Sequence, residues 1–170
     1  NHTAMEHLRN VVKQNTEHVG AYLQLGDLLR EDNHPEQAIK IHQALTVRPN
    51  LPDSLKVDIH KSLALDYSRK GEMEKAKIEG ERILKIDRKN TWCIEFLLEI
   101  AERERDWEQA ASMAKLSQRL NHSQDENRLA KFQVYQGMDK LARGDRPGAE
   151  TSFNKAIQLA PTFGLPYLRK

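Results

Sequence analysis

Five alanines recur along this chain of 170 residues at intervals of 34, 38, 34 and 39 positions, each in a similar local setting. They are Ala4, Ala38, Ala76, Ala110 and Ala149. A unit of about 34 residues that recurs with short insertions is typical of stacked helix–turn–helix repeats, where each unit buries its apolar face against its neighbours. The alanine series therefore predicts an all-α protein whose paired antiparallel helices stack into an α-α superhelix.

Columns of apolar and small residues accompany the alanines at helical spacing. Positions four and seven residues after an alanine lie on the same helix face as that alanine. The seventh position holds Val11, Leu45, Ile83, Ser117 and Ala156. Twelve residues before the alanines stand Gly26, Ala64, Leu98 and Gly137, which are mostly small. This second column predicts a first helix in each repeat that approaches its neighbour closely.

Turn chemistry falls in register with the columns. Five residues before each alanine stand Asn33, Gly71, Arg105 and Gly144. Glycine and asparagine tolerate the left-handed backbone that ends many helices, so this column predicts the turn within each helix pair. Asp106 and Asp145 follow that turn directly and are expected to cap the second helices.

The columns divide the chain into repeats. We expect helices at about 3–14, 18–31, 35–47, 55–70, 73–86, 91–104, 107–120, 125–143 and 146–159. The chain is interpreted as one array fragment, 1–170: 1–17 is the second helix of a preceding repeat, 18–52, 55–90, 91–124 and 125–162 are four full repeats, and 163–170 starts a further one. In the last full repeat Gln136 and Lys140 replace apolar residues. Its first helix is therefore expected to rotate, so that it buries Phe132, Tyr135, Met138 and Leu141.

Composition limits the partners and the compartment. Lys and Arg number 27 against 25 acidic residues, with the two signs interspersed, so a nucleic-acid partner is not expected. Cys93 is the only cysteine, which excludes an intrachain disulfide and a thiolate zinc cluster. The sequence shows no apolar run of about 20 residues and no signal peptide, so a cytoplasmic location is expected.

Catalytic patterns are lacking in this sequence. Its seven histidines form neither a His-x-x-His nor a His-Glu-x-x-His pair, and no nucleophile elbow or phosphate-binding glycine loop occurs. We therefore expect no catalytic residues, no metal ligands, no cofactor in this fragment and no enzymatic activity. His42 and His60 lie in packing columns and are expected to be hydrogen-bonded core imidazoles. Cys93 is expected to pack as a small apolar residue.

Candidate binding residues follow from helical phase, because the first helices of such arrays line a concave groove. The predicted groove residues are Leu23, Asp27, Arg30, Lys61, Leu65, Ser68, Arg69, Trp92, Glu95, Glu99, Glu102, Val134 and Met138. Trp92 either anchors a partner or packs between neighbouring helices. Glu95, Glu99 and Glu102 share one face, which either meets a basic partner segment or is solvated beside Arg103. Trp107 is expected to fill a turn between helices.

The columns also carry a family resemblance. Leu25–Gly26, Leu29, Ala38, Leu45 and Pro49 make the first full repeat resemble a tetratricopeptide repeat. Four further features are similar to the bacterial lipopolysaccharide assembly protein B family. These are the stretch Ala38–Leu45, Asp66–Tyr67 before Gly71, and Asp106–Trp107–Glu108–Gln109–Ala110, together with the uneven repeat spacing.

The resemblance implies a bacterial helical scaffold on the cytoplasmic side of the inner membrane, held there by an N-terminal anchor. It implies an adaptor that presents an early lipid A pathway deacetylase to a membrane-bound protease. It also implies a rubredoxin-like zinc module built from Cys-x-x-Cys pairs. Anchor and pairs are absent from this sequence and are expected outside it. Two alternatives stay open: a tetratricopeptide scaffold for another complex or for self-association through open repeat ends, and a regulatory arm of a larger enzyme.

Overall fold

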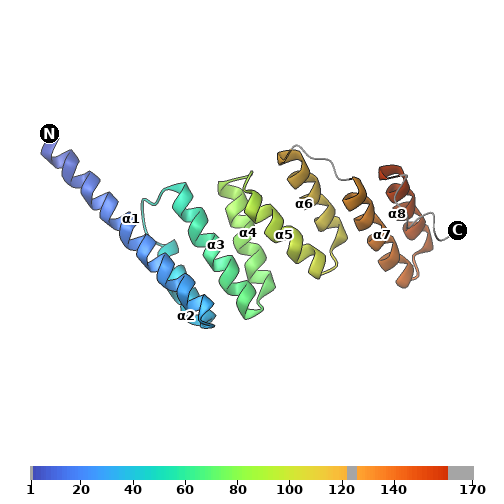
Figure 1. The fold of residues 1–170 in the computed structure, drawn as a ribbon, viewed down its shortest axis with the longest axis horizontal. Helices are drawn as coiled ribbons and strands as arrows, with labels where there is room; N and C mark the ends of the chain where they lie inside the picture. The colour runs from blue at the N-terminus through green and yellow to red at the C-terminus, as the bar shows by residue number, and fades with distance from the viewer. Residues whose placement is uncertain (1, 122–125, 161–170) are drawn as a thin grey trace. The chain divides into compact units, whose positions relative to one another are not determined.

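A computed structural model describes residues 2–121 and 126–160, with side chains from residue 16 onward. Eight helices and no strand occur in this part of the chain (Figure 1). They are α1 (His2–Glu31), α2 (Pro35–Thr46), α3 (Asp53–Lys70), α4 (Met73–Ile86), α5 (Thr91–Arg103), α6 (Trp107–Leu120), α7 (Glu126–Ala142) and α8 (Arg146–Leu159). Consecutive helices form the hairpins α1–α2, α3–α4, α5–α6 and α7–α8. The all-α prediction is confirmed.

The helices form two compact units, 1–88 with α1–α4 and 89–170 with α5–α8. In the first unit α2 packs against α3, and in the second α6 packs against α7. Each unit is therefore a stack of two hairpins, in which the second helix of one hairpin contacts the first helix of the next. A single array over the whole chain stays a prediction.

The alanine ladder lies where the helices meet. Ala38, Ala76 and Ala110 are 0% exposed and Ala149 is 1% exposed, whereas the side chain of Ala4 lies outside the described residues. A methyl group at these points lets neighbouring helices approach closely enough to pack their larger side chains. The predicted inward orientation is confirmed for the four described alanines.

The turns follow the predicted column. All four positions have a left-handed backbone: Asn33 (φ 65), Gly71 (φ 89), Arg105 (φ 59) and Gly144 (φ 86). Arginine carries a Cβ that disfavours this conformation by about 1 kcal/mol, so other contacts must hold Arg105 there.

Two aspartates cap second helices as expected. The Asp106 Oδ1 atom accepts a hydrogen bond from the Gln109 amide at 3.2 Å, at the start of α6. The Asp145 Oδ1 atom accepts one from the Gly148 amide at 3.0 Å, at the start of α8. Each carboxylate satisfies an amide that has no partner inside its helix.

The expected break between helices 3–14 and 18–31 is wrong, because α1 runs without interruption from His2 to Glu31. The segment Gln14–Glu17 contains neither glycine nor proline, so nothing in it opposes continued helical hydrogen bonding. Residues 1–17 are thus not a separate helix folded back on α1. Tyr22, Leu25 and Leu28 of α1 are 47%, 45% and 62% exposed, although Leu63 and Leu97, which occupy the repeat position of Leu25, are 1% and 5% exposed.

The expected rotation of α7 is also wrong in part. Phe132 is 3% exposed as predicted, but Met138 and Leu141 are 45% and 50% exposed. The helix keeps the column phase of the other repeats and buries Leu129, Ala130, Val134 and Gly137 instead. Val134, predicted to line the groove, therefore lies in the core.

Close packing against α8 explains this phase of α7. A Cβ on Gly137 would lie 2.7 Å from the ring of Phe153, so only glycine admits the ring in its present position. Lys140 stands where an apolar residue was expected, and its Nζ atom donates a hydrogen bond to Ser152 Oγ at 3.1 Å. The flexible lysine satisfies its polar end at the helix edge without a rotation of α7.

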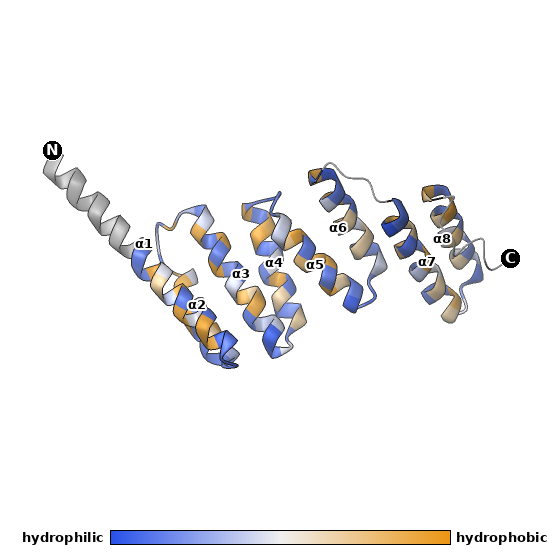
Figure 2. Ribbon diagram, in the orientation of Figure 1, coloured by the Kyte–Doolittle hydropathy of each residue, from blue (hydrophilic) through white to orange (hydrophobic). Residues whose placement is uncertain are grey.

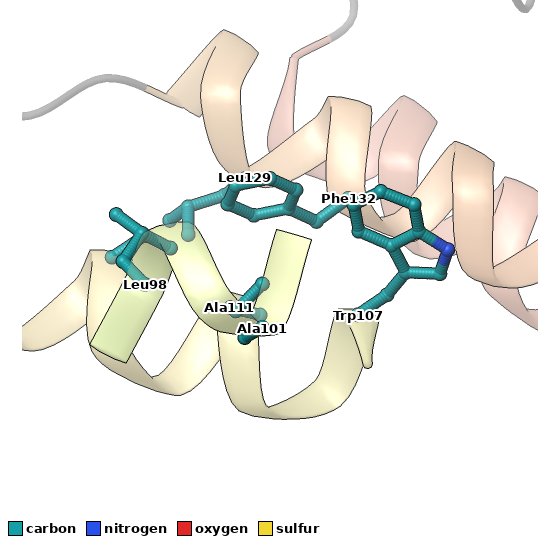
Figure 3. Packing of buried hydrophobic residues seen from close by; sticks show 8 residues of the cluster. Leu98, Ala101, Trp107, Ala111, Leu129 and Phe132 are labelled. Atoms are coloured by element: carbon teal, nitrogen blue, oxygen red, sulfur yellow. The ribbon is translucent and has the colours of Figure 1, made fainter. Parts of the chain in front are cut away.

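An aromatic cluster forms the core of the second unit. Trp107 stacks on Phe132 with ring centroids 5.9 Å apart, beside Leu98, Leu129 and several alanines (Figure 3). Apolar and polar residues alternate around the helices from α2 to α8, as expected when one face of each helix is buried (Figure 2). The structural role predicted for Trp107 is confirmed.

The alanine ladder makes a direct stability prediction. Replacing Ala110 by Leu should lower the free energy of unfolding by about 1–3 kcal/mol, because the closed helix contact has no room for three more carbons. Lys115→Leu, at an exposed position of the same helix, should change it by no more than about 0.5 kcal/mol. Urea denaturation followed by far-UV circular dichroism measures both. Equal effects of the two substitutions would contradict the ladder.

Candidate partner-binding faces

Each unit presents a face built from the first helices of its hairpins, which we call its first-helix face. In the first unit this face comes from α1 and α3, and in the second from α5 and α7. Six predicted groove residues lie in the first unit: Leu23, Asp27, Arg30, Lys61, Leu65 and Arg69. All are partly buried except Arg69, which is exposed.

Arg30 joins α1 to α3. Its Nη1 atom donates hydrogen bonds to Asp27 Oδ1 at 3.0 Å, to Asp66 Oδ1 at 3.0 Å and to the Ser62 carbonyl at 3.3 Å. Asp66 is 0% exposed, so this contact compensates a carboxylate that has been removed from water. Asp27 and Arg30 therefore hold the scaffold together, and any contact of theirs with a partner stays a prediction.

His42 of α2 completes this network through its contact with Asp66. The imidazole is 0% exposed; its Nδ1 contacts Asp66 Oδ2, and its Nε2 lies 3.1 Å from the Leu23 carbonyl. A Cβ on Gly26 would lie 2.2 Å from Nε2, so the small-residue column makes the space that the ring occupies. The prediction of a hydrogen-bonded core imidazole is confirmed.

The charge state of His42 follows from its neighbours. Burial disfavours the charged ring, but the hydrogen bond and charge of Asp66, the Leu23 carbonyl and the charge of Asp27 outweigh it, so the pKa of His42 is raised. A protonated imidazole donates from both nitrogens, which suits the two acceptors it faces. Asp66 was not among the predicted site residues, although Asp66–Tyr67 carried part of the family resemblance.

A polar pocket of about 410 Å³ lies between α2, α3 and α4. Gln43 donates a hydrogen bond to the Tyr67 hydroxyl at 2.7 Å on one wall. On the other, Glu79 contacts His60 Nδ1 at 2.6 Å and Arg82 at 2.7 Å. His60 is hydrogen-bonded as expected, but its side chain is 16% exposed, so it lies at the edge of the core and not inside it. Sequence reasoning did not find this pocket, because its residues come from three helices and form no motif.

The first-helix face of the second unit carries an aromatic pair and an acidic row. Trp92 stacks on Phe96 with ring centroids 5.0 Å apart and is partly buried. Both readings of Trp92, as a partner anchor or as a packing residue, stay open. Cys93 next to it is 0% exposed, so its prediction as a small core residue is confirmed.

The acidic row on α5 is partly neutralised from α7. Arg128 Nη2 lies 3.9 Å from Glu95 Oε2 and 3.7 Å from Glu102 Oε1. Glu95 also accepts a hydrogen bond from Ser117 Oγ at 2.6 Å, while Glu99 is exposed. Arg128 is thus a cation beside the row that the sequence analysis did not name, and the expected role of Arg103 stays a prediction.

A second pocket, of about 360 Å³, opens beside Trp107, and we call it the Trp107 pocket. It is lined by Glu102, Arg105, Trp107, Lys131, Phe132 and Tyr135. At its edge Asp139 accepts hydrogen bonds from Arg105 Nη2 at 2.6 Å and from the Trp107 indole at 2.9 Å. The Arg105 guanidinium lowers the pKa of Asp139. Backbone hydrogen bonds from Arg105 to the Glu102 carbonyl and from Asp106 to the Ala101 carbonyl close the left-handed turn, and the contact with Asp139 adds to them.

Asp66 and Asp139 occupy the same column, ten residues before Ala76 and Ala149. Each accepts hydrogen bonds from the preceding hairpin of its unit, Asp66 from α1 and α2 and Asp139 from the α5–α6 turn and α6. The two aspartates thus tie one repeat to the next. The sequence shows that the two aspartates share a column. Their hydrogen-bond donors lie in different columns, so no repeated donor–acceptor pair could be recognised in the sequence.

Comparison with known proteins agrees with this architecture. The chain is 24% identical over 152 residues to lipopolysaccharide assembly protein B of Escherichia coli strain K12, covering 89% of this chain and 39% of that protein. It is 27% identical over 145 residues to the protein of the same name from Haemophilus influenzae, covering 84% and 36%. Its fold resembles the crystal structure of MamA, with a TM-score of 0.54, 15% identity, and coverage of 92% and 86%. No protein-family model matches the chain.

The chain has a tetratricopeptide-like helical repeat fold. The resemblance to lipopolysaccharide assembly protein B is confirmed as sequence similarity, and the chain spans about two-fifths of the length of those relatives. None of the helices within 2–121 and 126–160 combines the length and apolar character needed to cross a membrane. The same part of the chain contains no group of three His, Cys, Asp or Glu side chains placed to hold a metal ion.

The His42 site predicts opposite effects for two identical substitutions on α1. Gly26→Ala should destabilise the protein by about 2 kcal/mol, since the new methyl displaces a buried ring from its hydrogen bonds. Gly20→Ala, where nothing lies within 4 Å of the added carbon, should stabilise the helix by about 0.5–1 kcal/mol. Urea denaturation measures both. Stabilisation by Gly26→Ala would show that the ring is not confined.

The raised pKa of His42 predicts a pH-dependent stability. The His42 ring of the unfolded chain has a pKa of about 6.5, so the stability that the charged ring adds to the folded state is fully present below that pH. It is lost as the pH rises through the raised folded pKa, by about 1.4 kcal/mol for each unit of elevation. Urea denaturation at a series of pH values from below about 6.5 upward should show this decline in the free energy of unfolding. The variant His42→Gln should show a smaller decline. An unsubstituted chain whose stability does not decline above this pH would disprove the charged ring.

Proposed function

We propose that this chain is a non-catalytic scaffold that binds segments of partner proteins on its first-helix faces. We further propose that it acts in the control of lipopolysaccharide biosynthesis, by presenting a lipid A pathway deacetylase to a membrane-bound protease. The observation that carries the proposal is similarity to lipopolysaccharide assembly protein B over 89% of the chain. In this proposal a tether outside the sequence holds the scaffold at the cytoplasmic side of the inner membrane.

The geometry of the first-helix faces supports a binding role. Arg69 and Glu99 are exposed there, on helices whose opposite sides are packed in the core. The helices beneath are already fixed by the Asp66 and Asp139 contacts, so the receptor loses little conformational freedom when a partner arrives. Binding energy can then go into contacts with the partner.

The polar clusters support a structural role more than a catalytic one. His42 and Asp66 form a pair of the kind that enzymes use for proton transfer, but both are 0% exposed. A general base has to come within hydrogen-bond reach of the proton that it removes. Because a substrate cannot reach this pair without opening the core, we assign it to stability.

Affinity purification from the native bacterium tests the proposal. The tagged intact protein that contains this chain should retain the lipid A pathway deacetylase and the membrane-bound protease, both identified by immunoblotting. The double variant Arg69→Glu with Glu99→Lys, at exposed first-helix positions, should recover about tenfold less of at least one of them, since it reverses charge on both faces.

A matched control keeps the same kinds of charge change but places them on second helices. Lys85→Glu with Glu108→Lys alters exposed positions of α4 and α6 and should leave recovery unchanged. Circular dichroism confirms that both variants fold. Recovery of neither protein by the unsubstituted protein would remove the lipopolysaccharide role, and equal loss in both variants would remove the assignment to the first-helix faces.

A further inference from the structure

The Trp107 pocket combines an aromatic floor with cations at its rim. Trp107 is 8% and Phe132 3% exposed, and Tyr135 lies against Trp107 with ring centroids 4.8 Å apart. The floor is therefore built and rigid, because the Trp107 indole is also hydrogen-bonded to Asp139. Such a surface can bind a planar or branched apolar side chain while the pocket itself loses little conformational entropy.

Two cations lie over these rings. The Arg105 guanidinium is 5.5 Å from the Trp107 ring and the Lys131 ammonium 5.6 Å from the Tyr135 ring. Arg105 is neutralised by Asp139 and Glu102 lies opposite Arg128, whereas the only contact of Lys131 with described residues is the aromatic ring. Among the described residues, no carboxylate pairs with the Lys131 ammonium of this pocket.

The neighbouring charges decide which kind of anion fits. Glu95, Glu99 and Glu102 lie along α5 on the same face, with Arg128 as the cation that contacts two of them. A polyphosphate chain that reached Lys131 would be repelled by this row. A single carboxylate on Lys131 meets one member of this row in the pocket, Glu102, which also faces Arg128 at 3.7 Å. This smaller repulsion favours a peptide over a nucleic acid.

We propose that the Trp107 pocket is a recognition site for an acidic peptide segment of a protein partner. The segment places a Phe or Leu side chain against Trp107 and Tyr135 and the carboxylate of an adjacent Asp or Glu on the Lys131 ammonium. Arg105 forms the fixed rim. This inference rests on the proposed scaffold function and names the chemistry of one partner site on it.

A nuclear magnetic resonance titration of the full chain tests the pocket. The probe is acetyl-phenylalanyl-glutamate amide, and the matched probe is acetyl-phenylalanyl-glutamine amide, which has the same shape without the charge. The acidic probe should shift the indole N–H signal of Trp107 in a saturable way, and the neutral probe should bind about fivefold more weakly. The indole of Trp92, outside the pocket, serves as the internal reference and should not move.

Two variants test whether the Lys131 ammonium binds the carboxylate of the acidic probe. Lys131→Gln should weaken binding of the acidic probe about fivefold and leave the neutral probe unaffected, since one ion pair is removed. Lys115→Gln, an exposed lysine of α6 outside the pocket, should bind both probes like the unsubstituted chain. Unchanged signal dispersion shows that each variant is folded.

Three results would overturn the proposal: no saturable Trp107 shift, equal binding of the two probes, or acidic-probe binding that is indifferent to Lys131→Gln. The purification experiment fails separately. If the probe binds the pocket but neither cellular protein is recovered, the peptide site stands and the lipopolysaccharide role does not. If the proteins are recovered and the probe does not bind, the scaffold stands and this site is wrong.

Discussion

Close contact between helices at an alanine in each repeat is the constraint on which the rest of the structure depends. Ala38, Ala76, Ala110 and Ala149 are at most 1% exposed, so the small methyl group of each lies inside the packed core. Side chains around each contact can interdigitate only because the helices lie this close. Gly26 and Gly137 extend the same principle to the first helices, where they admit the rings of His42 and Phe153.

Polar contacts then join one hairpin to the next. Asp66 and Asp139 stand in one column of the repeat, and each binds donors from the preceding hairpin of its unit. The partners differ: a buried imidazole and Arg30 in the first unit, an indole and Arg105 in the second. A repeat thus keeps the position of its acceptor while the donors vary, which ties neighbouring hairpins together and leaves the faces free to differ.

Helical phase predicted the groove residues only in part. Arg69 and Glu99 are exposed, as a groove residue has to be, and their place in a partner-binding groove stays a prediction. Helical phase misplaced Val134, which α8 covers, and it could not show that Arg30 is bonded to Asp66. What stands opposite a helix face depends on another helix, and a single periodic pattern carries no information about that neighbour.

The sequence by itself determined the helical class, the repeat, the inward alanines and the turns. These follow from periodicity and from the backbone preferences of glycine, asparagine and aspartate, which act within a few residues. Tertiary structure alone decided that α1 is continuous, that α7 keeps its phase, and that Trp107, Lys131 and Tyr135 enclose a pocket. Those outcomes depend on contacts between segments distant in the chain, where the space left by one side chain selects the position of another.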